Sequence, residues 1–288
     1  MTATLAIVAL AVLVLGAGAV LCYAARIEAR RFGITRLELY PAGWPAALDG
    51  FTILHFSDLH SRGDGPGERF LASLPEQLGE PDLVLCSGDF AEHVEALPAF
   101  LPVLAKLSAK HGKYAVFGNN DIDHDELCNR LRAGLTEAGF TVLHESAVRL
   151  EHDGQGLWLG GFGFRYLKGF CYRYSFPLKA LFGQAPPGEP RLLVSHTPDL
   201  LPEAAGAQVA VLLCGHTHGG QVCRPNGQPY RTNLFRFVCP AFGSGLYEVD
   251  GLLLYVNRGV GMTGPQVRTW CPPEVALLTL RAQNPRPG

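Results

Sequence analysis

The chain has 288 residues, of which 48% are hydrophobic and 17% are charged, and its formal net charge is −2. This length is sufficient for one large domain or two small ones with a buried core. The near-neutral charge gives no electrostatic case for nucleic-acid binding, so we expect no nucleic-acid partner.

The first predicted element is an apolar helix, because no charged residue occurs from Ala3 to Ala25. The run is about long enough to cross a hydrocarbon core of roughly 30 Å. A cleaved signal peptide is the alternative, but it requires basic residues before the run and none is present. Arginines follow the run instead, which favours a cytoplasmic location for the rest of the chain. We predict a single-pass anchor of the inner (cytoplasmic) membrane over 1–25 and a juxtamembrane linker over 26–50.

Strand-like and helix-like segments then alternate. Apolar runs typical of strands occupy 51–57, 82–87, 114–118, 157–163, 191–196 and 209–215. Helix-like segments cover 67–79, 93–110 and 123–138. A hairpin is predicted across Asp250-Gly251, and a last strand in the sequence EVALLTL. The pattern predicts an α/β fold over 51–288, a four-layer α/β/β/α sandwich of two packed sheets flanked by helices.

Polar side chains follow many of these strands. Since ligands bind where the carboxyl ends of strands converge, we expect these donors to meet at one edge. Carboxylate, imidazole and amide oxygen donors together suit Mn²⁺, Fe²⁺ or Zn²⁺. Six donors are too many for one catalytic ion, but fit two ions about 3.5–4 Å apart that share a carboxylate. The six are Asp58, Asp89, Asn119, His196, His216 and His218.

The sharpest single motif is GHTHGG, which places His216 and His218 in a glycine-flanked loop. Glycine lets the backbone come close there, so both rings can reach one place. The histidines outside the motifs are interpreted as structural. These are His55, His93, His111, His124, His144 and His152.

The ordered set DxH, GD, GNxD, a single His and GHTH resembles the calcineurin-like metallophosphoesterase superfamily over about Phe51 to Leu280. The segment 257–280 also resembles the tail of its membrane-anchored bacterial branch. Some members of that branch hydrolyse UDP-2,3-diacylglucosamine during lipid A synthesis, and others are phosphodiesterases. The alternative is a degenerate scaffold without metals, but no ligand of the motif set is missing.

The resemblance implies a role for each motif residue. Asp89 would bridge two divalent ions, of which Mn²⁺ is the first choice and Fe²⁺ or Zn²⁺ are alternatives. One ion would also be held by Asp58, His60 and His218, and the other by Asn119, His196 and His216. A water or hydroxide held between the ions would be the nucleophile.

The stretch FGNNDIDHD departs from the family pattern, because Asn120 stands where many members have a histidine that protonates the leaving group. Asn120 has no titratable proton, and Asp121, which orients that histidine in the family, loses its usual partner. We assign Asn120 and Asp121 to the catalytic set. The missing acid favours a pyrophosphate substrate, whose leaving phosphate is already a stable anion. His124 or a metal-bound water remains open as an alternative proton donor.

The segment 161–183 mixes aromatic residues with cations, including Arg165, Lys168, Arg173 and Lys179. One interpretation is a core strand followed by a solvated loop. The other is a cap or interfacial segment whose cations, Arg165, Lys168 and Arg173 in particular, bind the substrate's phosphates. Such mixing also suits single-stranded nucleic acid, but the anchor and the net charge argue against it.

We therefore predict a membrane-bound, dinuclear-metal phosphoesterase that acts on a lipid-linked phosphate, with no obligate protein partner evident. The first choice of substrate is UDP-2,3-diacylglucosamine, cleaved to diacylglucosamine 1-phosphate and UMP. The alternatives are a broad phosphodiesterase or phosphatase for envelope lipids or small nucleotides, and a non-enzymatic membrane adaptor on the same scaffold.

Overall fold

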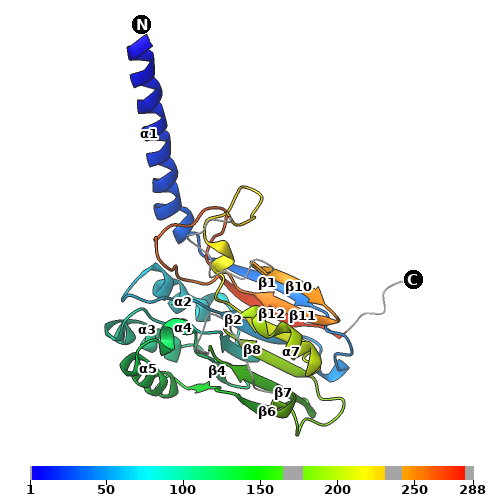
Figure 1. Cartoon of the computed structure of the whole chain (residues 1–288). Helices are drawn as coiled ribbons and strands as arrows, with labels where there is room; N and C mark the ends of the chain where they lie inside the picture. The colour runs from blue at the N-terminus through cyan, green and yellow to red at the C-terminus, as the bar shows by residue number, and fades with distance from the viewer. Residues whose placement is uncertain (1, 165–177, 231–241, 283–288) are drawn as a thin grey trace, which may run out of the picture.

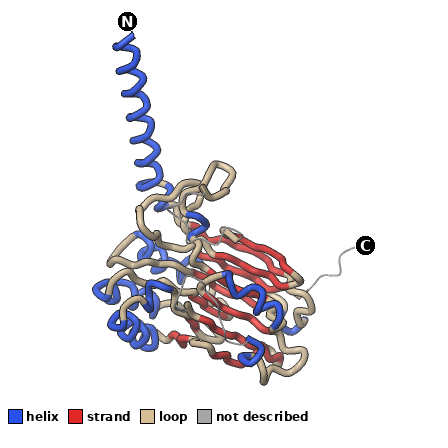
Figure 2. The backbone as a smooth tube through the Cα atoms, in the orientation of Figure 1, coloured by secondary structure: helices blue, strands red, loops and turns tan. Residues whose placement is uncertain are grey.

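The computed structural model describes residues 2–164, 178–230 and 242–282, and it folds into four layers around two six-stranded sheets (Figure 1). Helices cover the outer face of each sheet, and the two sheets pack face to face (Figure 2). The predicted α/β/β/α sandwich is therefore confirmed.

The first sheet has the order β1-β12-β2-β3-β4-β5. Strands β2, β3, β4 and β5 run parallel, so their carboxyl ends lie at the same edge. The bounds are β1 Gly33–Leu39, β12 Glu274–Leu280, β2 Phe51–Phe56, β3 Leu83–Cys86, β4 Lys113–Ala115 and β5 Phe140–Val142.

Strand β1 lies inside 26–50, the segment that we predicted as a linker. It pairs in parallel with β12 along its whole length, from Gly33 with Glu274 to Leu39 with Leu280. Only Leu39 of β1 is buried, since β1 is an edge strand, and its sequence GITRLEL carries two charges. That weak apolar signal explains why the strand was not predicted.

The second sheet has the order β10-β11-β9-β8-β7-β6, and its central strands β11, β9, β8 and β7 are parallel. The predicted hairpin at Asp250-Gly251 is confirmed: both residues have positive φ, as a two-residue type I′ turn requires. The bounds are β6 Ser146–His152, β7 Gln155–Phe162, β8 Arg191–Ser195, β9 Val211–Cys214, β10 Gly245–Val249 and β11 Leu252–Val256.

The helices present apolar stripes to the sheets. In α5 (Asp125–Glu137), Leu127, Leu131 and Leu135 recur every four residues and are buried against the first sheet. The other helices on this face are α2 (Pro66–Gln77), α3 (Leu97–Ala105) and the short α4 (Asn119–Ile122). On the second sheet lie α6 (Leu178–Leu181) and α7 (Leu201–Gly206). Short 3₁₀ turns are η1 Glu28–Arg30, η2 Ala46–Leu48, η3 Val94–Ala96, η4 Pro198–Leu200 and η5 His218–Gly220.

The core between the sheets is built from alternate residues of the strands. Ile53 and Leu85 from the first sheet, and Val194 and Leu213 from the second, are fully buried there. Two further apolar clusters fill the spaces between each sheet and its helices. These layers hold the strand ends in fixed positions, which is what a site assembled from many loops requires.

The N-terminal helix α1 (Thr2–Arg26) projects away from the sandwich (Figure 1). A 27-residue span, Thr4–Arg30, is long and apolar enough to cross a membrane, and its most apolar window is not buried in the protein. The base of the helix does contact the domain, because the Arg268 amide donates to the Ala24 carbonyl at 3.1 Å. The Arg268 side chain is itself fully buried and donates to the carbonyls of Arg258 and Gly261.

Candidate metal centre

The loops after five parallel strands meet at one edge of the sandwich. From the first sheet, Asp58 follows β2, Asp89 follows β3 and Asn119 follows β4. From the second sheet, His196 directly follows β8, and the GHTHGG loop follows β9. Strands β2, β3 and β4 are parallel to one another, and so are β8 and β9, so the carboxyl ends within each set share an edge. The distances between residues of the two sets show that these edges meet.

Five residues of this edge have left-handed backbones although none is glycine. Their φ values are +50° for Asp58, +43° for His60, +57° for Asp89, +70° for His216 and +51° for His218. Non-glycine residues avoid this region, and each costs on the order of 1–3 kcal/mol when held there. Neighbouring backbone bonds hold them, such as the Asp58 amide to the Gly88 carbonyl at 2.9 Å. Concentration of such strain at one place is typical of functional sites.

Asp58, His60 and His218 form the first group of potential ligands. The His60 Nε2 and His218 Nε2 atoms are 3.0 Å apart, and Asp58 Oδ1 lies 3.5 Å from His218 Nε2 and 4.0 Å from His60 Nε2. All three residues are buried. Ligands about 2.0–2.2 Å from one ion lie roughly 3–3.5 Å from each other, so the group fits a divalent ion.

Asp89, His196 and His216 form the second group. His196 Nε2 lies 3.0 Å from His216 Nδ1 and 3.5 Å from Asp89 Oδ2. The Asn119 carbonyl oxygen Oδ1 is 3.2 Å from the same His196 nitrogen. Imidazole nitrogens and oxygen atoms thus converge in the mixture that borderline divalent ions prefer.

Asp89 connects the two groups. Its Oδ2 atom lies 3.4 Å from His60 Nε2 in the first group and 3.5 Å from His196 Nε2 in the second. Only glycine fits at position 118 beside Asp89, because a Cβ there would come within 2.0 Å of Asp89 Oδ1. One carboxylate between two ligand groups is the arrangement of a dinuclear centre.

The hydrogen bonds of two rings leave the right nitrogen free for a metal. His196 Nδ1 lies 2.7 Å from the Ser87 carbonyl, which can only accept, so this nitrogen carries the proton and Nε2 presents its lone pair to the site. His60 Nδ1 lies 2.7 Å from Glu92 Oε1, which fixes its ring in the same way. Without a cation, the Nε2 lone pairs of His196 and His60 and the Asp89 carboxylate would face one another and repel.

The directions of the pKa shifts of Asp58 and His218 also favour a cation in this site. Burial, followed by the charge of Asp89, raises the pKa of Asp58 although nearby histidines oppose it, and burial lowers the pKa of His218 well below its usual range. Two buried carboxylates so close together repel each other, and a dication between them removes that repulsion. The donor set therefore fits a pair of divalent ions.

Glu92 belongs to this site and was not predicted. It lies three residues after Asp89 in the sequence GDFAE, and its second oxygen Oε2 lies 3.9 Å from Arg62. The His60 hydrogen bond lowers the pKa of Glu92, so the carboxylate is charged when it holds the ring. An acidic residue one short turn after a predicted ligand is the signal that could have identified it.

Replacement of Glu92 with alanine is expected to weaken metal binding by about 10–100-fold, because His60 loses the partner that orients its ring. Metal titration of the purified protein would measure this change. Glu95→Ala, at an exposed position three residues further on, is the matched control and should bind metal normally. Equal affinity in the two variants would contradict the role of Glu92.

The catalytic roles of Asn120 and Asp121 stay predictions, and the structure shows which groups their side chains contact. The Asn120 amide Nδ2 donates to Asp89 Oδ2 at 2.9 Å, and its backbone N–H donates to Asp89 Oδ1 at 2.9 Å. Asp121 is fully buried and accepts the backbone N–H groups of Gly118, Asp89 and Phe90 at 2.7–2.8 Å. Burial, followed by the charge of Asp89, raises the pKa of Asp121 to about 7. These three hydrogen bonds tie the Asp121 carboxylate to the loop backbone.

The predicted substrate-binding residues Arg165, Lys168 and Arg173 lie outside the described residues, so their role stays a prediction. Lys179, from the same stretch, lies in α6 and is exposed.

The sequence model of the family described as calcineurin-like phosphoesterase matches residues 51–220. An uncharacterized metallophosphoesterase of Bacillus subtilis, YkuE, is 30% identical over 96% of this chain and 95% of its own. The phosphodiesterase YaeI of Escherichia coli is 32% identical over 80% of this chain and 82% of its own. The UDP-2,3-diacylglucosamine pyrophosphatase LpxG of Chlamydia muridarum is 26% identical over 89% and 91%.

Proposed function

This chain belongs to the calcineurin-like phosphoesterase family, and from that premise we propose that it hydrolyses a lipid-linked pyrophosphate at a membrane surface. It is a metal-dependent phosphoesterase, because the family match covers the residue groups that could hold two ions. The proposed substrate is UDP-2,3-diacylglucosamine. The observation that carries the proposal is a pocket that joins the base of α1 to the metal centre.

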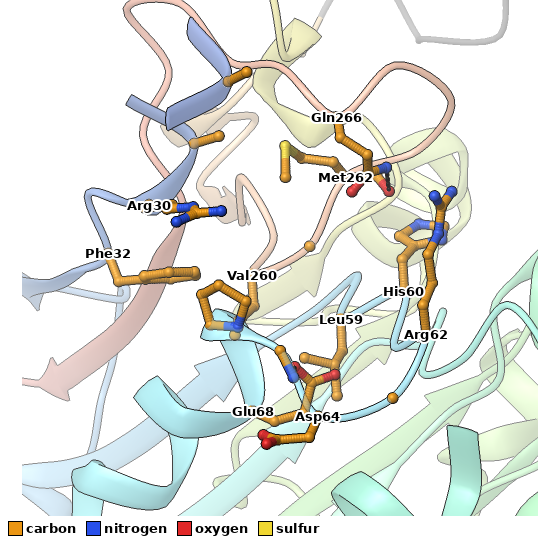
Figure 3. Close-up of a pocket in the computed structure, with 17 residues that line it drawn as sticks. Arg30, Phe32, Leu59, His60, Arg62, Asp64, Glu68, Val260, Met262 and Gln266 are labelled. Carbon is orange, nitrogen blue, oxygen red and sulfur yellow. Dashed lines mark hydrogen bonds between the residues drawn. The ribbon is translucent and has the colours of Figure 1, made fainter. Parts of the chain in front are cut away.

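That pocket has a volume of about 320 Å³ and lies between the end of the anchor helix and His60. Its walls are mixed: Phe32, Val260 and Met262 are apolar (Figure 3). Among the charged lining residues, Arg30 and Arg62 are cationic and Asp64 and Glu68 are acidic. The volume is within the range of ligand sites, which combine apolar lining with a few polar groups. Such a wall suits an amphiphile that carries acyl chains and phosphates.

The pocket borders both the base of α1 and the metal centre. Ala25 and Ala29 contribute from the base of α1 and the turn after it. On the other side, the Gly261 amide donates to the Asp58 carbonyl at 2.6 Å. A lipid that remained partly in the membrane beside α1 would therefore meet the two ligand groups without leaving the surface completely.

The proposed ligands are those implied by the motifs. Asp58, His60, Asp89 and His218 would hold one ion, and Asp89, Asn119, His196 and His216 the other, with Mn²⁺ as first choice. The bound ions supply Lewis-acid chemistry, which lowers the pKa of a water molecule and neutralises charge on phosphoryl oxygens. The protein holds this arrangement in place: Glu92 and Ser87 fix two rings, Asn120 holds Asp89, and Asp121 fixes the loop.

The absence of a histidine at position 120 supports a pyrophosphate substrate. In such a reaction a water oxygen joins one phosphorus atom, the bridging P–O bond breaks, and a phosphate monoester leaves as an anion. That anion needs no proton in the transition state, since its second pKa is about 6. An alkoxide would need one, and the Asn120 amide has no titratable proton that it could transfer.

A second candidate function is phosphodiester hydrolysis. The similarity to a bacterial phosphodiesterase at 32% identity supports it. The similarity to a UDP-2,3-diacylglucosamine pyrophosphatase over 89% of this chain supports the first candidate. We further propose the predicted domain order, an anchor followed by one catalytic domain, on the cytoplasmic side of the inner membrane, because Arg26, Arg30 and Arg31 follow the apolar run.

Incubation of the full chain in detergent with UDP-2,3-diacylglucosamine tests the proposal. We expect Mn²⁺-dependent release of UMP, loss of activity with a chelator, and recovery when Mn²⁺ is added back. An aryl phosphodiester serves as the comparison substrate under the same conditions. A rate on the aryl phosphodiester that exceeds the rate on the lipid would favour the second candidate and refute the first.

A further inference from the structure

A third group of metal-ligating side chains, Asp82, His111 and His152, lies at the opposite edge of the sheets from the metal centre. Asp82 directly precedes β3, and His111 precedes β4, so both are at the amino ends of parallel strands. His152 is the last residue of β6, beside the turn that leads into β7. We interpreted both histidines as structural from the sequence, where nothing relates residues of different sheets.

The three side chains present ligand atoms that all lie within 4.8 Å of one another. His111 Nε2 is 2.9 Å from His152 Nδ1, and the same His152 nitrogen is 3.8 Å from Asp82 Oδ1. Ligands of a tetrahedral Zn²⁺ ion lie roughly 3.3–3.5 Å apart, so shifts of about 0.5 Å would place an ion among them.

The carboxylate of Asp82 is already oriented for this role. The Thr52 amide and hydroxyl both donate to Asp82 Oδ2 at 2.7 Å, which leaves Oδ1 directed toward the histidines. Asp82 is only 3% exposed. The Phe51 ring stacks on His111 with ring centroids 5.9 Å apart and meets the edge of His152 at 5.2 Å, so both imidazoles are packed in place.

One cation competes for the site. The Lys110 ammonium lies 3.0 Å from Asp82 Oδ1, but its side chain is 53% exposed and can turn to solvent. Asp153 Oδ2 lies 3.7 Å from His152 Nε2, in the position of an outer carboxylate partner.

We propose that Asp82, His111 and His152 form a Zn²⁺ site that ties the two sheets together at the edge remote from the metal centre. Two imidazoles and one carboxylate are a zinc ligand set, with water in the fourth position. Asp82 and His111 adjoin the first sheet, whereas His152 belongs to the second, so an ion here would link them. The site does not depend on the proposed reaction.

Zinc stoichiometry of the full chain in detergent tests this site, with Zn²⁺ alone as the probe after removal of other metals. We expect three zinc ions per wild-type chain and two in His111→Ala and in His152→Ala. His144→Ala, at an exposed histidine in none of the described ligand groups, is the matched control and should bind three. Added zinc should also raise Tm further in the wild type and control than in the two site variants, by about 5 °C at 100-fold excess over Kd.

Lys110→Met gives an independent readout if the alanine variants do not fold. Removing the competing ammonium should tighten zinc binding at the third site several-fold, whereas a simple hydrogen-bonded histidine pair predicts no additional zinc. Equal zinc counts in the wild type and both histidine variants, or unchanged zinc affinity in Lys110→Met, would overturn the proposal.

Discussion

Replacement of Asp89 with alanine is expected to lower kcat by about 10³-fold or more, because one carboxylate serves both ligand groups. Its Oδ2 atom lies within 3.5 Å of a histidine from each group. Two dications a few ångströms apart need an anion between them, and loss of several kcal/mol of charge stabilisation corresponds to three or more powers of ten in rate. The bound metal should fall below two ions per chain in the same variant.

The fold is expected to survive this change. Removal of Asp89 relieves its repulsion of Asp58, whose pKa is raised by burial and by the charge of Asp89. It also removes the attraction of His196 and His60, which lowers the pKa of Asp89 against the effect of burial, so the two effects oppose each other. Asn120→Ala is the comparison: it removes only the side chain that holds Asp89, and should cost about 10–100-fold. Rates would be measured on purified proteins at saturating Mn²⁺, with circular dichroism as the control for folding. Equal losses in the two variants would contradict the bridging role.

The positions of the predicted ligands follow from a simple rule about parallel sheets. Asp58, Asp89 and His196 each come shortly after a buried apolar strand, and strand ends of one direction share an edge. A strand that is buried on both faces can be predicted from the sequence, because it forms a nearly continuous run of apolar residues. The sequence VLLC of β9 is an example. The sandwich and the gathering of these loops could therefore be predicted from the sequence.

Other features depend on contacts that no local pattern encodes. Strand β1 is stabilised by pairing with β12, more than 230 residues later in the chain, and its own sequence is half polar. Asp121 accepts hydrogen bonds from three backbone amides. Its position in the first turn of α4 directs its carboxylate to the Gly118 amide at the start of the helix. The pocket at the base of α1 is lined both by Ala25 and Ala29 and by the loop at 260–262, which are far apart in the sequence.

Replacement of Asn120 with histidine is expected to increase alkyl phosphodiester hydrolysis by about 10²-fold or more, while pyrophosphate hydrolysis changes little. General acid catalysis contributes typically about 10²–10⁴-fold when the leaving group needs a proton. An alkoxide does, and a phosphate monoester anion does not. Position 120 is suited to such a donor, because its side chain is half-buried and reaches both Asp89 and the His60 ring, at 2.9 and 3.3 Å.

The ratio of the two rates is the informative quantity, because a general disturbance of the metal centre would lower both. Asn120→Gln serves as the control of similar size, since it keeps an amide that cannot act as an acid. The gain in the histidine variant should disappear at high pH, where the ring is neutral and its remaining N–H is too weak an acid to protonate the leaving oxygen. A pyrophosphate rate that rises in parallel with the diester rate would show that the wild-type enzyme lacks an acid it needs, and the substrate argument built on Asn120 would then be wrong.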